Sequence, residues 1–165
     1  MQEINSFDAF AEPDATRLIL GSMPGAESLR RRQYYAYPHN CFWKIMGELL
    51  GFDCRIDYKE RVEYLLRDRI ALWDTVQRCV RPGSMDSDIK HARPNDFEKL
   101  FRECPNIRKV FFNGQAAHKL FVRHCREMRL PELELIILPS TSPANASIPY
   151  GKKLEAWRQV ACFQQ

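Results

Sequence analysis

Four short apolar runs, each followed at once by a polar or glycine-containing loop, constrain the fold of this chain more than any other feature. The hydrophobicity of these runs is mostly continuous, which is typical of strands covered on both faces. The runs cover residues 17–20, 70–73, 109–112 and 133–138, and helical patterns cover residues 42–50, 59–67, 96–103, 115–125 and 152–162. This alternation predicts an α/β fold, a three-layer α/β/α sandwich around a short, mainly parallel four-stranded sheet.

Length and composition fit a single domain that covers residues 1–165. The chain is 45% hydrophobic and contains ten Phe, six Tyr and three Trp, which is enough apolar surface for a sizeable core. This composition excludes a disordered chain, a collagen-like repeat and a disulfide-stapled miniprotein. The formal net charge of +4 suits a phosphate-rich partner without requiring one.

The distribution of metal-binding and targeting residues favours a cytoplasmic protein without a cofactor. The six cysteines include no CxxC pair and the four histidines form no HExxH or HxH pattern, so we expect reduced thiols and no metal site. His39 and Cys41 are two residues apart in an irregular stretch, which does not by itself make a nucleophile–base pair. Neither a signal peptide nor an apolar stretch of membrane-spanning length is found.

Ligands of parallel sheets bind outside the carboxyl ends of the strands, so the loops after the apolar runs should converge there. The first of these loops reads GSMPG over residues 21–25. Its two glycines would let backbone N–H groups approach an anion or a polar ligand atom closely. The loop matches neither the phosphate loop nor the dinucleotide fingerprint, and an ordinary structural turn remains an alternative.

A second segment, YYAYPHNCFW over residues 34–43, concentrates five aromatic side chains just after the basic run at residues 30–32. Aromatic faces beside cations are suited to stacking bases and holding phosphates. Because Pro38 interrupts regular helix, Tyr35 and Asn40 are candidate binding residues. A third segment, LPSTSPANAS over residues 138–147, follows the last run and offers hydroxyls and small residues for contact with a sugar-phosphate backbone.

Taken in order, these three loops resemble those of the uracil-DNA glycosylase superfamily, over roughly residues 15 to 162. The members of that superfamily carry a glycine/proline loop after the first strand and an HPS- or MPS-like loop after the last. Other branches have asparagine or aspartate in the first loop where this sequence has Met23. The GSMPG and YYAYPHNCFW stretches, together with Asn113 after the third run, resemble the hypoxanthine-DNA glycosylase branch most.

The resemblance implies a role for each loop. It implies that Asn40 and Asn113 are catalytic and that Tyr35 stacks on the flipped base. The remaining implied base contacts are Ser22 and Met23, and the implied DNA contacts are Gly21, Pro24, Gly25, Ser140, Thr141, Ser142, Ala144 and Asn145. The last two lie where the family has the side chain that fills the gap left by the flipped nucleotide, and both are small for that task.

The function implied is a monomeric, cofactor-independent DNA glycosylase that removes hypoxanthine during base excision repair. Uracil excision is one alternative, and a non-catalytic α/β binding module is another. A side-chain amide could distinguish hypoxanthine from adenine by accepting from N1–H and donating to O6 in one bidentate contact. Asp74, with Asp86, is an alternative activator of water, unless Asp74 only caps the turn before Thr75.

Overall fold

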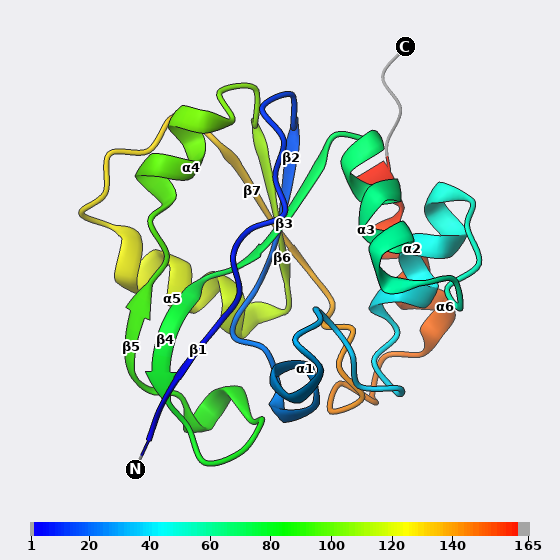
Figure 1. Cartoon of the computed structure of the whole chain (residues 1–165), viewed down its shortest axis with the longest axis horizontal. Helices are drawn as coiled ribbons and strands as arrows, with labels where there is room; N and C mark the ends of the chain where they lie inside the picture. Colours follow the sequence, from blue (N-terminus) through cyan, green and yellow to red (C-terminus); the bar gives the residue numbers. More distant parts are fainter. Residues whose placement is uncertain (1, 162–165) are drawn as a thin grey trace.

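The computed structural model describes residues 2–161, and a four-stranded parallel sheet lies at its centre (Figure 1). The strand order is β3-β2-β6-β7. The four predicted strands are present with nearly the predicted bounds: β2 Arg17–Gly21, β3 Ile70–Asp74, β6 Lys109–Asn113 and β7 Glu134–Leu138. The expected three-layer α/β/α arrangement around a parallel sheet is confirmed.

The sheet has a hydrophobic core on each face, because successive side chains of a strand point to opposite sides. Leu18 and Leu20 belong to the cluster beneath α4 (Phe97–Glu103) and α5 (Gln115–Cys125). Ile19 belongs to the opposite cluster, which includes side chains of α2 (Phe42–Leu50), α3 (Tyr58–Arg67) and α6 (Tyr150–Trp157). Figure 1 shows these two groups of helices on opposite sides of the sheet. The apolar runs of β2, β3 and β6 are therefore covered on both faces, whereas the edge strand β7 leaves Leu135 and Ile137 exposed, contrary to expectation.

A second, antiparallel sheet was not predicted. It has the order β1-β4-β5, with bounds β1 Glu3–Asn5, β4 Val76–Val80 and β5 Lys90–Pro94. The sequence indicates no strand between residues 74 and 94, but only Thr75 separates β3 from β4. These strands are short and partly exposed, so they lack the continuous apolar run that identifies a central strand.

Two helical segments also differ from expectation. The helix α1 (Ala26–Arg31) was not predicted, and it ends at Arg32 in the left-handed conformation (φ 56°). The last helix, α6, starts before residue 152 and gives way to the 3₁₀ turn η2 (Arg158–Ala161), while its predicted end at Cys162 lies outside the described residues. Another 3₁₀ turn, η1 (Asp86–Asp88), lies between β4 and β5. Within residues 2–161, no helix has the length and apolar character to cross a membrane.

Candidate active site

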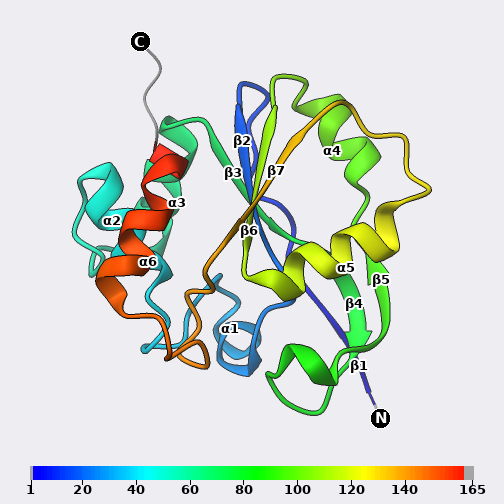
Figure 2. The same ribbon diagram turned by 180° about the vertical axis from the view of Figure 1, so that it is seen from behind.

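A cavity of about 330 Å³ opens at the carboxyl end of the parallel sheet, where the predicted loops meet. Figures 1 and 2 show α1, the η1 segment and the chain that follows β7 gathered at this end. Residues from all three predicted loops line the cavity, and so do Asp74 and residues 84–86. The loops therefore converge as expected, and residues 84–86 form an additional wall of the cavity.

Gly21 is the position where the site requires the smallest residue. It ends β2 and pairs with Asp74 of β3. A Cβ at Gly21 would lie 2.5 Å from Asp74 Oδ1 and 2.8 Å from the Tyr35 hydroxyl oxygen, both well inside normal contact distances. The glycine therefore allows a carboxyl group and a phenol to approach the same stretch of backbone at the base of the cavity.

Asp74 is buried, with 3% of its surface exposed. Its Oδ2 has no hydrogen-bond partner within residues 2–161, so its side chain does not cap the turn before Thr75. Burial, reinforced by the nearby charge of Asp86 and opposed by Arg81, raises the pKa of Asp74 to about 8. The carboxyl group therefore carries a proton at neutral pH and cannot act there as a base for water.

Tyr35 occupies a strained position above this carboxyl group. Its φ of 55° is unusual for a residue with a Cβ, and such strain is found at functional sites when the surrounding structure maintains it. One face of its ring stacks on Phe42 at a centroid distance of 4.1 Å, which leaves the other face for a ligand. Burial and then the Asp74 carboxyl raise the pKa of Tyr35, while the neighbouring Asn113 amide opposes the shift.

Asn40 is fixed at the start of α2. The Phe42 main-chain N–H donates to Asn40 Oδ1 at 3.0 Å, and the Asn40 main-chain N–H donates to the Tyr37 carbonyl at 2.9 Å. These bonds fix the amide oxygen and leave the side-chain Nδ2 available as a donor. Because Asn40 also lines the cavity, its amide nitrogen is a preorganised donor for a ligand.

Asn113 is held by Thr141 through two bonds. Asn113 Nδ2 donates to Thr141 Oγ1 at 2.9 Å, and the Thr141 main-chain N–H donates to Asn113 Oδ1 at the same distance. These two bonds occupy Oδ1 and one of the two N–H groups of the Asn113 amide, which lie side by side on one edge of the side chain. That edge is no longer free for the bidentate base contact that the sequence suggested, and the remaining N–H of Asn113, beside the Tyr35 hydroxyl, is the donor left for a ligand.

Thr141 is a positioning residue in this structure. Only 1% of its surface is exposed, its hydroxyl bonds to Asn113, and its carbonyl accepts from the Cys41 main-chain N–H at 3.1 Å. Its hydroxyl is engaged by the Asn113 amide, while the contact with DNA that the family resemblance implies stays a prediction. Its position joins the last loop to the third strand and to the start of α2.

The rest of the last loop is braced by its own hydroxyls. Ser140 Oγ accepts from the Ser142 main-chain N–H at 3.1 Å, and Ser142 Oγ accepts from the Ala144 main-chain N–H at 3.2 Å. Asn145 Nδ2 donates to the Ser140 carbonyl at 3.2 Å. Because both serines act here as acceptors, each retains its O–H as a donor toward a phosphate.

Residues 84–86 line the cavity, and they belong to the irregular stretch at residues 82–94 that the sequence predicts on the ligand side, because it follows the second predicted strand. Arg81 donates to the Pro24 carbonyl at 2.5 Å, and the Ala26 main-chain N–H donates to Ser84 Oγ at 2.8 Å. Ser22 Oγ donates to Asp86 Oδ1 at 2.6 Å. These bonds tie the segment to the GSMPG loop.

Met23 lies between the cavity and the core. It borders the cavity but is only 6% exposed and packs with Val76 and Cys79. A thioether neither accepts a proton nor orients water well, so the position that carries a polar group in other branches is a packing position here.

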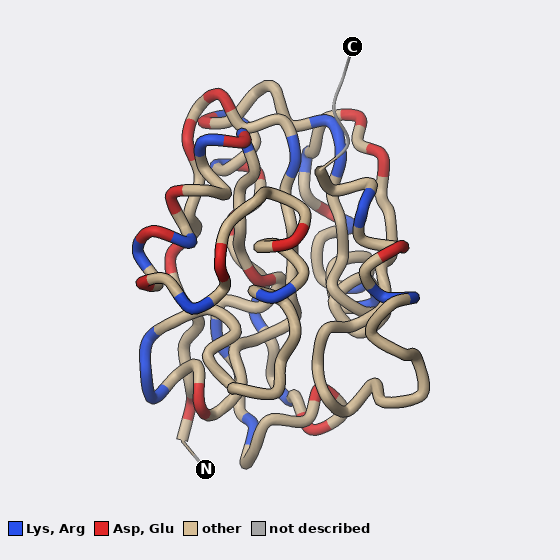
Figure 3. The backbone as a smooth tube through the Cα atoms, turned by 90° about the vertical axis from the view of Figure 1, so that its right-hand side faces the viewer, with Lys and Arg blue, Asp and Glu red and all other residues tan. Residues whose placement is uncertain are grey.

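In the view of Figure 3, Lys and Arg positions alternate with Asp and Glu positions along much of the chain. Arg30 and Arg31 of the basic run each bond to Glu27 at 2.6 Å, although both guanidinium groups remain well exposed. The loop at residues 138–147 contains no charged residue. Within residues 2–161, no group of three His, Cys, Asp or Glu side chains could hold a metal ion.

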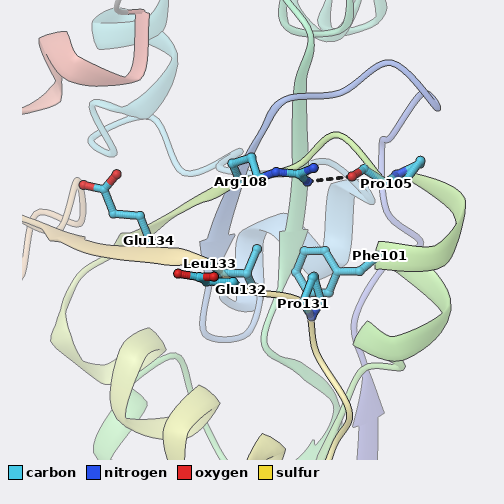
Figure 4. A pocket seen from close by; sticks show the side chains of 7 residues that line it. All are labelled: Phe101, Pro105, Arg108, Pro131, Glu132, Leu133 and Glu134. Atoms are coloured by element: carbon cyan, nitrogen blue, oxygen red, sulfur yellow. Dashed lines mark hydrogen bonds between the residues drawn. The ribbon is translucent and has the colours of Figure 1, made fainter.

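A second cavity, of about 610 Å³, lies at the opposite end of the sheet, beside the starts of β6 and β7 (Figure 4). Its arginine, Arg108, donates to the Pro105 carbonyl at 2.7 Å. The remaining lining residues are Phe101, Pro131, Glu132, Leu133 and Glu134. No unpaired buried polar atom lies among these residues, so the cavity lacks the convergent polar groups of the first site.

The fold and this site are those of a DNA glycosylase: the chain belongs to the uracil DNA glycosylase superfamily, whose family model matches residues 7–161. A "Hypoxanthine DNA glycosylase" of Methanosarcina barkeri is 40% identical over 129 residues, which cover 78% of this chain and 79% of the relative. Another of the same name, from Methanosarcina acetivorans, is 35% identical over 155 residues, covering 93% and 95%.

A solved structure gives the same result for the fold. The chain is similar to the solution NMR structure of a Methanosarcina acetivorans protein described as a candidate uracil DNA glycosylase. The TM-score is 0.82 at 34% identity, and the match covers 97% of each chain. The family resemblance inferred from the three loops is thus confirmed.

Proposed function

We propose that this chain is a monomeric, cytoplasmic DNA glycosylase that hydrolyses the N-glycosidic bond of deoxyinosine in DNA and releases hypoxanthine. The observation that carries the proposal is the site itself: Asn40 and Asn113 face one cavity at the end of the sheet, in a chain related to two hypoxanthine DNA glycosylases. No redox or metal cofactor is required by this chemistry.

Cleavage of the glycosidic bond passes through a positively charged, oxocarbenium-like sugar and a departing base that gains negative charge. Donors held in place before the reaction stabilise that base without reorganising. The free Nδ2 of Asn40 and the remaining N–H of Asn113 are such donors. We therefore assign catalysis to these two amides, with Tyr35 stacking on the flipped base.

Access to the bond requires extrusion of the nucleotide, which costs a few kcal/mol. Gly21, Pro24, Gly25, Ser140, Ser142, Ala144 and Asn145 are proposed to contact the DNA backbone, and Ser22 and Met23 border the base. The hydroxyls of Ser140 and Ser142 are the donors that remain free for a phosphate, whereas Pro24 has no N–H and contributes shape alone. The uncharged character of both loops means that much of the phosphate binding depends on dipoles, with added attraction from Arg30–Arg32.

The test is single-turnover excision on oligonucleotides containing inosine, uracil or xanthine, followed by alkaline cleavage. Asn40→Ala and Asn113→Ala should each lower inosine excision by ~10²–10³ while DNA affinity changes little. Asn106→Ala is the matched control, because Asn106 is exposed in the turn before β6. Faster release of uracil than of hypoxanthine would replace the substrate assignment, and no release of any base would favour a binding module.

A further inference from the structure

The strongest unused feature of the site is the carboxyl group of Asp74. It lines the cavity, is almost completely buried, and has an oxygen without a hydrogen-bond partner among residues 2–161. Leaving a buried polar atom unpaired is unfavourable, so natural proteins retain such atoms where a ligand or a reaction uses them. Asn95 holds the main chain here by donating to the Asp74 carbonyl at 2.7 Å.

The charged and titratable groups around Asp74 come from several elements. Asp86 of η1 and Arg81 after β4 are the charged ones. Three phenols face it as well: Tyr34 and Tyr35 from the segment before α2, and Tyr58 from the start of α3. Burial together with the Asp86 charge outweighs Arg81, and the net result is a carboxyl group that keeps its proton at neutral pH.

We propose that Asp74 is a further catalytic residue, the general acid that protonates the departing purine. This inference rests on the proposed glycosylase function, which it deepens. The C1′–N9 bond breaks and its electron pair moves into the purine ring, while the Asp74 proton transfers to the ring atom that faces Oδ2. Water then bonds to C1′ and gives a proton to the carboxylate, so the acid is restored and hypoxanthine leaves neutral.

The architecture supports this role better than that of a base. A general acid must hold its proton at the working pH and release it within hydrogen-bond reach of the leaving group. Asp74 lines the cavity and its buried Oδ2 has no partner within residues 2–161, while the glycine at position 21 leaves room for the carboxyl group beside Tyr35. A purine anion is a poor leaving group, so protonation lowers the barrier more than hydrogen bonding alone.

The experiment measures single-turnover inosine excision from pH 5 to pH 9.5. Asp74→Asn should lose ~10²-fold or more at pH 7, the usual contribution of a general acid, while circular dichroism and DNA affinity show a folded, binding protein. In the wild-type protein, excision should fall about tenfold per pH unit above the Asp74 pKa of about 8.

Inosine itself loses its N1 proton at alkaline pH, so the decisive comparison is between variants. Asp86→Asn removes the charge that raises the Asp74 pKa and should move the alkaline fall to lower pH. The control Asp88→Asn makes the same charge change at an exposed position of the same turn and should leave the profile in place.

Excision by Asp74→Asn within threefold of wild type at pH 7 would overturn the proposal. So would identical alkaline limbs for Asp86→Asn and Asp88→Asn. Either result leaves the glycosylase function standing as long as the wild-type protein cuts inosine. Failure of the wild-type protein to release hypoxanthine at any pH would instead refute the proposed function.

Discussion

Replacing Asp74 by asparagine should stabilise the folded protein at neutral pH. An unfolded chain ionises this aspartate near its ordinary pKa of 3.8, whereas burial keeps it protonated in the folded state up to about pH 8. Between those values folding takes up a proton, so the free energy of unfolding falls as pH rises, by about 1.4 kcal/mol per pH unit. From pH 4 to pH 7 the accumulated loss is about 4 kcal/mol, and above pH 8 it stays constant.

Asparagine at position 74 does not titrate, so the variant lacks this slope. Urea unfolding at pH 5, 6 and 7 measures it directly: the excess stability of Asp74→Asn over wild type should grow by about 1.4 kcal/mol per pH unit. Asp88→Asn, at an exposed position, should differ from wild type by the same amount at each pH. Parallel pH dependences for the wild-type and Asp74→Asn proteins would refute the argument that the carboxyl group is buried and protonated. The expected pH dependence would show that the buried carboxyl group in the site lowers the stability of the folded protein at neutral pH.

Three further predictions concern the site's construction. Gly21→Ala should abolish most single-turnover excision, because the new Cβ would collide with Asp74 and Tyr35. In urea titrations the same variant should lose about 1–3 kcal/mol of the free energy of unfolding. A variant with near-normal excision and stability would contradict the close approach. Thr141→Val should lower excision about tenfold and the free energy of unfolding by about 1 kcal/mol, since the valine cannot accept from Asn113 Nδ2; unchanged excision would show that one bond positions Asn113 sufficiently. Alanine at all three positions of Arg30–Arg32 should weaken binding to every DNA sequence alike, as measured by fluorescence anisotropy. The slope of log affinity against log salt concentration should become shallower by about 1 to 3. An unchanged slope would show that the run is only solvated surface.

Much of the fold could be predicted because it depends on local pattern. The run at residues 17–20 becomes β2, Arg17–Gly21, and the run at residues 109–112 becomes β6, Lys109–Asn113. Continuous apolar strands are typical of parallel sheets covered on both faces, so four such runs among helical patterns predict a parallel sheet with two helical layers. The antiparallel sheet escaped prediction because strands such as β5, Lys90–Pro94, are exposed at an edge and carry no such run.

The location of the site also followed from the sequence. Strand ends in a parallel sheet fix where the following loops meet. The family resemblance singled out Tyr35, Asn40 and Asn113, and all three line one cavity at that end. Residue type then limited the chemistry, because amide and aromatic groups without a metal-ligand cluster suit base recognition. What each side chain does within the cavity depends on neighbours that are distant in the chain.

The sequence by itself therefore determined the parallel sheet, its helical layers and the end of the sheet that binds a ligand, since these depend on hydrophobic period and strand direction. Only the tertiary structure decided which polar groups are free to react. Thr141 occupies the amide edge of Asn113 from 28 residues away, and Gly21 lets Asp74 approach Tyr35. Protonation of that aspartate results from its removal from water and its distance to Asp86, quantities that exist only once the chain has folded.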